Sequence, residues 1–125
     1  MLAGLGIDMV EIARVQRELR ASGPAPCESV LTAAELGRAR ASRSTALAVA
    51  RCFAAKEALF KALGHGWQGG LAWREVELCD GGDGSARLLL SGQVQRAAER
   101  LGVRHVSVSV SHTERLAMAS VVLEA

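Results

Sequence analysis

The residues best suited to chemistry lie in the run RCFAAKEALFKALG, at positions 51–64. The run predicts an amphipathic helix, because its apolar side chains gather on one face when each residue advances by about 100°. Lys56 lies in the middle of that face, Glu57 flanks it, and Lys61 follows one turn beyond Glu57. A carboxylate and two ammonium groups therefore converge on a partly apolar surface, which suits the binding of a metal ion and a phosphate.

The same charges also have an ordinary structural interpretation. Glu57 and Lys61 are four residues apart, the spacing of a common ion pair on a helix surface. Lys56 could lay its aliphatic stem along the apolar face and extend its ammonium group into water. The helix alone leaves both interpretations open, and two segments near the ends of the chain bear on the choice.

The first of these segments is the amino-terminal stretch LAGLGIDMVEIARV. It predicts a short strand over residues 2–7 and a helix over about residues 10–20. Asp8 lies at the predicted junction, where an aspartate can cap the helix through its side-chain oxygen. A carboxylate held rigidly at such a junction can equally ligate a hard cation.

The second segment is the carboxy-terminal stretch, in which valine and serine alternate over residues 106–111. This alternation predicts a half-buried strand. A turn over residues 112–115 would lead into a closing strand over residues 116–123. His112 would then lie at the end of the first of these two strands.

Taken together, the three segments resemble the phosphopantetheinyl transferases, and more closely the small holo-acyl-carrier-protein synthase type. The family pattern has three blocks, which occur here in the same order over nearly the whole chain. The blocks are Gly6, Ile7 and Asp8; Phe53, Lys56, Glu57, Ala58 and Lys61; and Ser111, His112, Ala117 and Ala119. The resemblance implies the α+β fold of this family, in which a long central helix packs on an antiparallel sheet.

The resemblance also implies a reaction, the transfer of the 4'-phosphopantetheine arm of coenzyme A to a serine of apo acyl carrier protein, with release of adenosine 3',5'-bisphosphate. Attack on a pyrophosphate builds negative charge that positioned cations stabilise. Mg²⁺ held by carboxylates and substrate phosphates is the usual solution, and Mn²⁺ suits the same oxygen ligands. By resemblance, Asp8 and Glu57 bind the metal and Lys61 contacts the phosphates. Either Glu57 or a metal-bound water could deprotonate the serine.

Four further residues receive binding roles from the resemblance. Lys56 is expected to reach a phosphate of coenzyme A. Gly64 opens a glycine-rich loop that is expected beside the coenzyme, although a glycine here is also the usual residue to end a helix. His112 is expected near the nucleotide, with a structural role at the strand end as the alternative. Arg14 matches a carrier-docking position, and we expect it to pair with an acidic helix of the carrier.

One position departs from the family pattern. Relatives usually carry an arginine immediately before Phe53, whereas here Cys52 occupies that position and the arginine is Arg51. On a helix, the shift by one residue rotates the guanidinium by about 100°. We therefore leave Arg51 out of the predicted site.

Composition favours a compact cytoplasmic enzyme. With 125 residues, 50% of them hydrophobic, the chain is expected to form a single domain, 1–125, with a substantial core. The three cysteines form no C-x-x-C motif, so free thiols in a reducing compartment are expected. The spacing of the three histidines does not match a structural zinc site. No signal peptide or membrane-spanning helix is expected.

The rest of the chain predicts further α and β elements around the long helix, which should run over residues 45–63. Thr32 and Glu35 form a capping-box pattern at the start of a short helix. The other expected elements are a loop over residues 23–26, an exposed connection over 39–44, strands over 73–79 and 86–90 joined by a turn over 81–84, and a helix over 93–101.

Small members of the family work as homotrimers with sites between subunits, so a homotrimer is expected by resemblance. The carrier would belong to fatty-acid or polyketide synthesis. The alternative function is a module that binds coenzyme A or another nucleotide without transfer, which would not need both Asp8 and Glu57. A nucleic-acid partner is not expected, because the net charge is only +2 and the chain has no Tyr and two Phe with which to stack bases.

Overall fold

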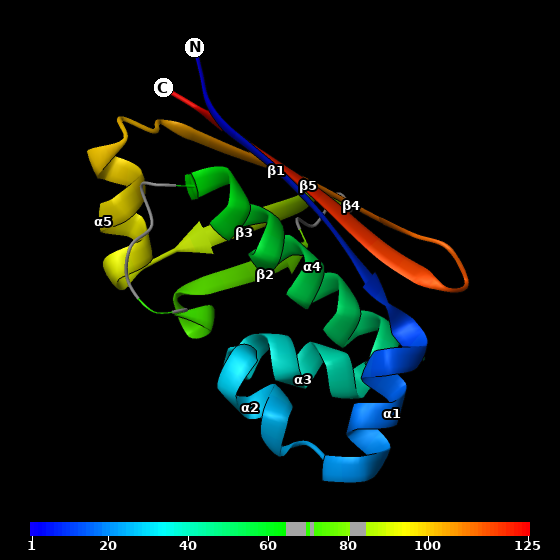
Figure 1. Ribbon diagram of the computed structural model, residues 1–125. Coiled ribbons are helices and arrows are strands. Elements are labelled where there is room, and N and C mark those ends of the chain that lie inside the picture. Colours follow the sequence, from blue (N-terminus) through cyan, green and yellow to red (C-terminus); the bar gives the residue numbers. More distant parts are fainter. Residues whose placement is uncertain (65–69, 71, 81–84) are drawn as a thin grey trace.

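The long helix α4 (Thr45–Leu63) lies at the centre of the molecule and packs against β1 and β5 of an antiparallel sheet (Figure 1). The computed structural model describes residues 1–64, 70, 72–80 and 85–125. The other elements are β1 (Leu2–Glu11), α1 (Ile12–Ser22), α2 (Ala25–Val30), α3 (Ala33–Ala41), the 3₁₀ helix η2 (Trp73–Glu75), β2 (Val76–Asp80), β3 (Ala86–Leu90), α5 (Gly92–Arg100), β4 (His105–His112) and β5 (Leu116–Glu124).

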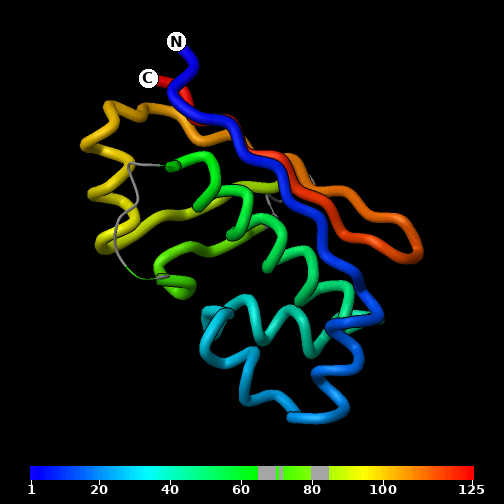
Figure 2. Tube along the Cα trace, in the orientation of Figure 1, coloured from blue at the N-terminus to red at the C-terminus, as the bar shows by residue number. Residues whose placement is uncertain are grey.

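Two antiparallel sheets surround α4. The larger has the strand order β1-β5-β4, and the smaller pairs β2 with β3. The two ends of the chain lie side by side at one end of the larger sheet (Figure 2), where the backbone N–H of Ala125 donates to the carbonyl oxygen of Met1 at 2.8 Å. Helices α1, α2 and α3 gather at the amino-terminal end of α4 (Figure 1). The predicted α+β fold, with a long helix on an antiparallel sheet, is confirmed.

Helix α4 has the bounds that the sequence predicts. Its start is capped by Ser44, whose side chain accepts a hydrogen bond from the backbone N–H of Leu47 at 3.2 Å. Its end is Gly64, which adopts a φ of 51°, a conformation that glycine tolerates best. Most of the helix between these caps is buried, and alanines let the neighbouring elements approach closely. None of the described helices is long and apolar enough to cross a membrane.

Strand β1 lies directly on α4 because two of its residues lack side chains. A Cβ atom at Gly4 would overlap the carbonyl oxygen of Ala62, and one at Gly6 would overlap that of Ala58. Alternate residues of a strand face the same side. Asp8 therefore also faces α4, two residues beyond Gly6.

The prediction that Asp8 lies at a strand-to-helix junction is wrong. Strand β1 continues to Glu11, which pairs with Leu116 of β5, so Asp8 lies within the strand. The residue before α1 is Glu11, whose side chain makes no capping hydrogen bond. The capping interpretation of Asp8 is thereby excluded. The pairing of β1 with β5 fixes the backbone of Asp8, and this positions its side chain.

Several other boundaries differ from the prediction. The expected loop over 23–26 instead leads into α2, since Pro26 fits the first turn of a helix. Helix α3 extends to Ala41, so only part of the expected connection over 39–44 is irregular. The first part of the expected strand over 73–79 is η2. The capping box of Thr32 and Glu35 and the strand over 86–90 are confirmed; the turn over 81–84 lies outside the described residues.

Candidate active site

Asp8 and Lys61 come together where β1 crosses α4. The ammonium group of Lys61 donates to Oδ1 of Asp8 at 2.8 Å and to the carbonyl oxygen of Ile7 at 3.2 Å. The side chain of Asp8 is 13% exposed and that of Lys61 is 53% exposed. The hydrogen bond to Asp8 is the main reason that the pKa of Lys61 is raised. Lys61 therefore presents a stable positive charge at the surface.

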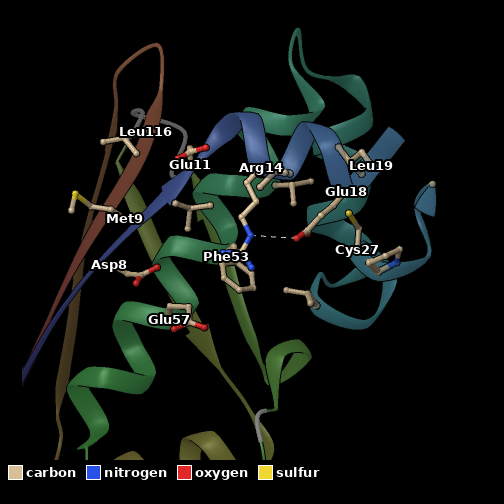
Figure 3. A pocket seen from close by; sticks show the side chains of 16 residues that line it. Asp8, Met9, Glu11, Arg14, Glu18, Leu19, Cys27, Phe53, Glu57 and Leu116 are labelled. Atoms are coloured by element: carbon tan, nitrogen blue, oxygen red, sulfur yellow. Dashed lines mark ion pairs between the residues drawn. The ribbon is translucent and has the colours of Figure 1, made fainter. Parts of the chain in front are cut away.

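Glu57 lies one turn before Lys61 and completes a cluster of three charges. Burial raises the pKa of Glu57, the negative charge of Asp8 raises it further, and the positive charge of Lys61 lowers it. Figure 3 shows the carboxylates of Asp8 and Glu57 next to each other, one from β1 and the other from α4. The two carboxylates face the same space, and the charge of Asp8 disfavours the ionised state of Glu57.

This space is a pocket of about 690 Å³ between β1, α1, α2 and α4. Asp8 and Glu57 line one end of it, together with Arg14 of α1 and Phe53 of α4 (Figure 3). Apolar residues of α1 and α2, among them Leu19, continue the lining away from the carboxylates. The pocket thus joins a charged end to an apolar groove.

The carboxylates of Asp8 and Glu57 fit a divalent cation. Both are oxygen donors, and both line the same open pocket. Within the described residues, no group of three or more His, Cys, Asp or Glu side chains could hold a metal ion. An ion bound by these two carboxylates would take its other ligands from water and substrate phosphates. Mg²⁺ is usually coordinated in this way in proteins.

Lys56 is not part of this cluster. Its side chain is fully buried, and three acceptors among the described residues surround its ammonium group, one for each proton. They are Oε1 of Glu35 at 2.6 Å and the carbonyl oxygens of Val30 at 2.7 Å and Trp73 at 2.9 Å. The geometry therefore gives no support to the prediction that Lys56 contacts coenzyme A.

Comparison with known proteins bears directly on the family. A model of the 4'-phosphopantetheinyl transferase superfamily matches residues 4–120. The chain belongs to the 4'-phosphopantetheinyl transferase superfamily. Within it, a holo-[acyl-carrier-protein] synthase of Solibacter usitatus is 37% identical to this transferase over 124 residues, which cover 99% of each chain.

Solved structures agree with this membership. The holo-[acyl-carrier-protein] synthase of Neisseria meningitidis is 30% identical, with a TM-score of 0.91 and full coverage of both chains. The enzyme of Helicobacter pylori, solved in complex with coenzyme A, is 26% identical, with a TM-score of 0.81 over 96% of this chain and 99% of that one. The predicted family, fold and holo-acyl-carrier-protein synthase type of transferase are confirmed.

Gly64 and His112 occupy different places in this transferase. Gly64 is exposed at the end of α4, three residues beyond Lys61, and the loop after it lies outside the described residues up to Gly70. His112 is exposed at the end of β4, as predicted. Among the described residues, His112 lines a separate hollow of about 630 Å³ and not the pocket of Asp8. Of these two residues, Gly64 is the one that lies close in sequence to the cluster of Asp8, Glu57 and Lys61.

The position at which this transferase departs from the family pattern faces its core. Cys52 is buried, and its pKa is raised to about 12, first by burial and then by the charge of Glu35. Arg51 is half-buried.

The sequence analysis assigned Glu35 only to a helix cap and missed its pairing with Lys56. A lysine in an apolar stripe was the available signal, because a buried ammonium needs a carboxylate partner.

Proposed function

We propose that this transferase moves the 4'-phosphopantetheine arm of coenzyme A to a serine of apo acyl carrier protein, releases adenosine 3',5'-bisphosphate, and depends on Mg²⁺. The proposal rests on the convergence of Asp8, Glu57 and Lys61 at one end of an open pocket. The whole chain would act as one domain.

Each residue of the cluster has a distinct proposed role. Asp8 and Glu57 would hold Mg²⁺, which when bound neutralises charge on the pyrophosphate. Lys61 would place its ammonium group on the phosphates of coenzyme A, where negative charge grows as the serine oxygen attacks. The carboxylate of Glu57 would also accept the proton of the attacking serine. The serine oxygen forms a bond to the β-phosphorus, and the bond from that phosphorus to the bridging oxygen breaks.

Arg14 would guide the carrier to this pocket. It lies on α1, lines the pocket beside the two carboxylates, and is largely exposed. Its pair with Glu18, at 3.4 Å, is an exposed ion pair and contributes little to stability. Arg14 could therefore leave Glu18 and pair with an acidic group of a carrier helix at little cost in free energy. This pairing would bring the carrier serine to the end of the pocket that holds Glu57.

A second copy of the chain would complete the site. Leu5, Ile7 and Met9 of β1 point away from α4 and are 57–60% exposed, an apolar strand face that a partner subunit can cover. We propose a homotrimer with sites between subunits, in which a neighbouring subunit supplies His112 near the nucleotide and Gly64 lies beside the coenzyme. The free thiols of the three cysteines are consistent with a cytoplasmic enzyme of lipid biosynthesis.

Intact-protein mass spectrometry tests the proposal. Apo acyl carrier protein is incubated with this protein, coenzyme A and Mg²⁺, beside a control in which the metal is chelated. We expect the carrier to gain the mass of one phosphopantetheine, and chelation to abolish the gain. Binding of coenzyme A with no gain on carriers of fatty-acid or polyketide synthesis would favour a coenzyme-binding module instead.

A further inference from the structure

Lys56 and Glu35 form an ion pair in the interior of the protein, next to the proposed active site. Both side chains are 0% exposed, and Nζ lies 2.6 Å from Oε1. Two charges removed from water are costly, and apolar residues of the same volume often stabilise a core at least as well. The pair therefore invites an explanation other than overall stability.

The bonds of Lys56 join three segments to α4. Its ammonium donates to Val30 at the end of α2, to Trp73 in η2 and to Glu35 in α3. Each of these bonds has a direction, so together they fix where the side chain of Lys56 points. They also fix the rotation of α4 relative to the three segments around it.

The bonds of Glu35 extend the same network. Oε1 accepts from the backbone N–H of Thr32 at 2.8 Å, which anchors the start of α3. Oε2 accepts from the backbone N–H of Leu78 at 2.7 Å, which anchors β2. The carboxylate thus has a donor on each oxygen besides the bond to Lys56. A network satisfied in this way favours one arrangement of its segments.

Two of the segments that the pair joins, α2 and α4, also line the pocket. Val30, whose carbonyl accepts from Lys56, lines the pocket, and so does Phe53, one turn before Lys56. The ring of Phe53 stacks on that of Trp73, with centroids 5.0 Å apart. Glu57 directly follows Lys56 on α4. A rotation of α4 that broke the bonds of Lys56 would move Glu57 and the pocket wall together.

We propose that Lys56 and Glu35 are positioning residues of the transferase site, which set the rotation of α4 and thereby the aim of the Glu57 carboxylate. The inference rests on the proposed role of Glu57 as a metal ligand. Neither residue of the pair contacts the substrate in this account. Both act through Glu57 and through the wall formed by Val30 and Phe53.

Two double variants provide the test. In Lys56→Met/Glu35→Gln, both buried charges disappear and the side-chain volumes are nearly kept, so no unpaired charge is left in the core. The matched control is Arg40→Met/Glu28→Gln, which removes an ion pair between α3 and α2 whose side chains are 59% and 58% exposed. Circular dichroism and thermal unfolding establish that each variant is folded.

The readouts are kcat for carrier modification and the dissociation constant of Mn²⁺ in the presence of coenzyme A, followed by the paramagnetic resonance of free Mn²⁺. For the buried pair we expect kcat to fall and the Mn²⁺ dissociation constant to rise, each by about 10- to 100-fold, the range for groups that orient metal ligands. The control should leave both quantities unchanged.

Two results would overturn the proposal. One is a folded Lys56→Met/Glu35→Gln protein with wild-type kcat and Mn²⁺ affinity. The other is failure of that variant to fold, because the pair would then support the fold as a whole. If the wild type modifies no carrier, the proposed function fails, while a weaker Mn²⁺ affinity of the buried-pair variant alone would still support positioning of Glu57.

Discussion

Asp8 and Glu57 are two carboxylates at one end of a pocket, and Lys61 is the cation that the chain itself supplies to them. Lys61 donates to Asp8 at 2.8 Å. Burial is the main cause of the raised pKa of Glu57, and the charge of Asp8 is the second. The charges of Asp8 and Lys61 therefore both influence how readily Glu57 binds a proton.

The coupling predicts the effect of Lys61→Met on the pH dependence of the reaction. The charge of Lys61 lowers the pKa of Glu57, so its removal should raise that pKa. The acidic limb of kcat/KM should then move to higher pH, because the ionised form of Glu57 is the form proposed to bind the metal. On the plateau, kcat should fall about 10²-fold, because Lys61 is proposed to donate to the phosphates. Lys61→Arg keeps the charge and should keep the limb in place; an unshifted limb in Lys61→Met would contradict the coupling.

Glu57→Gln should separate activity from stability. The folded-state pKa of Glu57 lies above the ordinary value of 4.5, so the folded protein holds this proton more tightly than the unfolded chain does. This tighter proton binding adds to the free energy of unfolding. The contribution is fully present below pH 4.5 and is lost as the pH rises through the folded-state pKa of Glu57. Glutamine does not ionise and escapes this loss. We expect a melting temperature at neutral pH no lower than that of the wild type, together with loss of Mg²⁺-dependent turnover; a clearly lower melting temperature would refute this linkage.

Arg14→Glu should affect the carrier and not the coenzyme. The reversal places a negative charge at the pocket where an acidic carrier is proposed to dock, and the KM for the carrier should rise about 10-fold at low salt. The dissociation constant of coenzyme A, measured by calorimetry, should stay nearly unchanged. Arg96→Glu on α5, an exposed position on a helix far from α1 (Figure 1), is the control. Equal losses of carrier and coenzyme affinity in Arg14→Glu would contradict a docking role.

Among the elements, the contact of β1 with α4 is the one that positions the charged cluster. Gly4 and Gly6 let the strand backbone touch the helix, and Asp8 follows on the same face. Lys61 of the helix then reaches Asp8 of the strand directly. The closeness of these two elements, which two glycines permit, determines the distance between the charges.

Gly6→Ala tests this contact. The added methyl group would overlap the carbonyl oxygen of Ala58, so the strand must move away from the helix. We expect the free energy of unfolding to fall by about 1–3 kcal/mol. Gly37→Ala in α3, where a Cβ meets nothing within 4 Å, should instead stabilise the protein by up to about 1 kcal/mol. Chemical denaturation of both variants measures the difference, and a Gly6→Ala protein as stable as the wild type would show that the contact is not tight.

Elements defined by local signals were predictable from the sequence. Helix α4 runs between Ser44 and Gly64, two residues whose capping preferences are local, and the capping box of Thr32 and Glu35 is a four-residue pattern. The end of β1 was not predictable in this way. It is decided by the pairing of Glu11 with Leu116, more than a hundred residues later in the chain.

The cluster of Asp8, Glu57 and Lys61 was anticipated as a set of residues, whereas its surroundings were not. The charge pattern of α4 places Glu57 and Lys61 on adjacent turns, but it says nothing of the strand that meets them. For Lys56, the pattern showed only that a charge lies in an apolar face. Its partner Glu35 comes from another helix, and only the packing of α3 on α4 brings the two together.

At the scale of the whole molecule, one face of the larger sheet is covered by α4 and the other carries exposed apolar side chains. The exposed face contains Leu5, Ile7 and Met9 of β1. On the same side, β4 presents serines, since Ser107 and Leu5 both pair with Val122 of β5. An apolar edge beside a polar strip is suited to partial burial by another subunit.

Leu5→Glu should weaken assembly without unfolding the subunit. The side chain is 57% exposed and points away from α4, so a glutamate there meets solvent in the monomer and an apolar surface in the proposed trimer. Sedimentation should show a smaller species than the wild type, with unchanged circular dichroism. Loss of carrier modification should accompany the change in size if sites lie between subunits. A variant with wild-type mass and activity would contradict the proposed interface.

Mixing two inactive variants tests whether a site draws on two subunits. Glu57→Gln lacks a proposed metal ligand, and His112→Ala lacks the proposed nucleotide contact, which lines a different hollow of the same chain. In a mixed trimer formed by unfolding and refolding the two proteins together, some sites would combine an intact Glu57 from one subunit with an intact His112 from another. We expect partial recovery of carrier modification in the refolded mixture. We expect none when the two folded proteins are mixed without unfolding, because their subunits then do not exchange. No recovery in trimers shown by mass spectrometry to be mixed would place Glu57 and His112 of each site on a single chain.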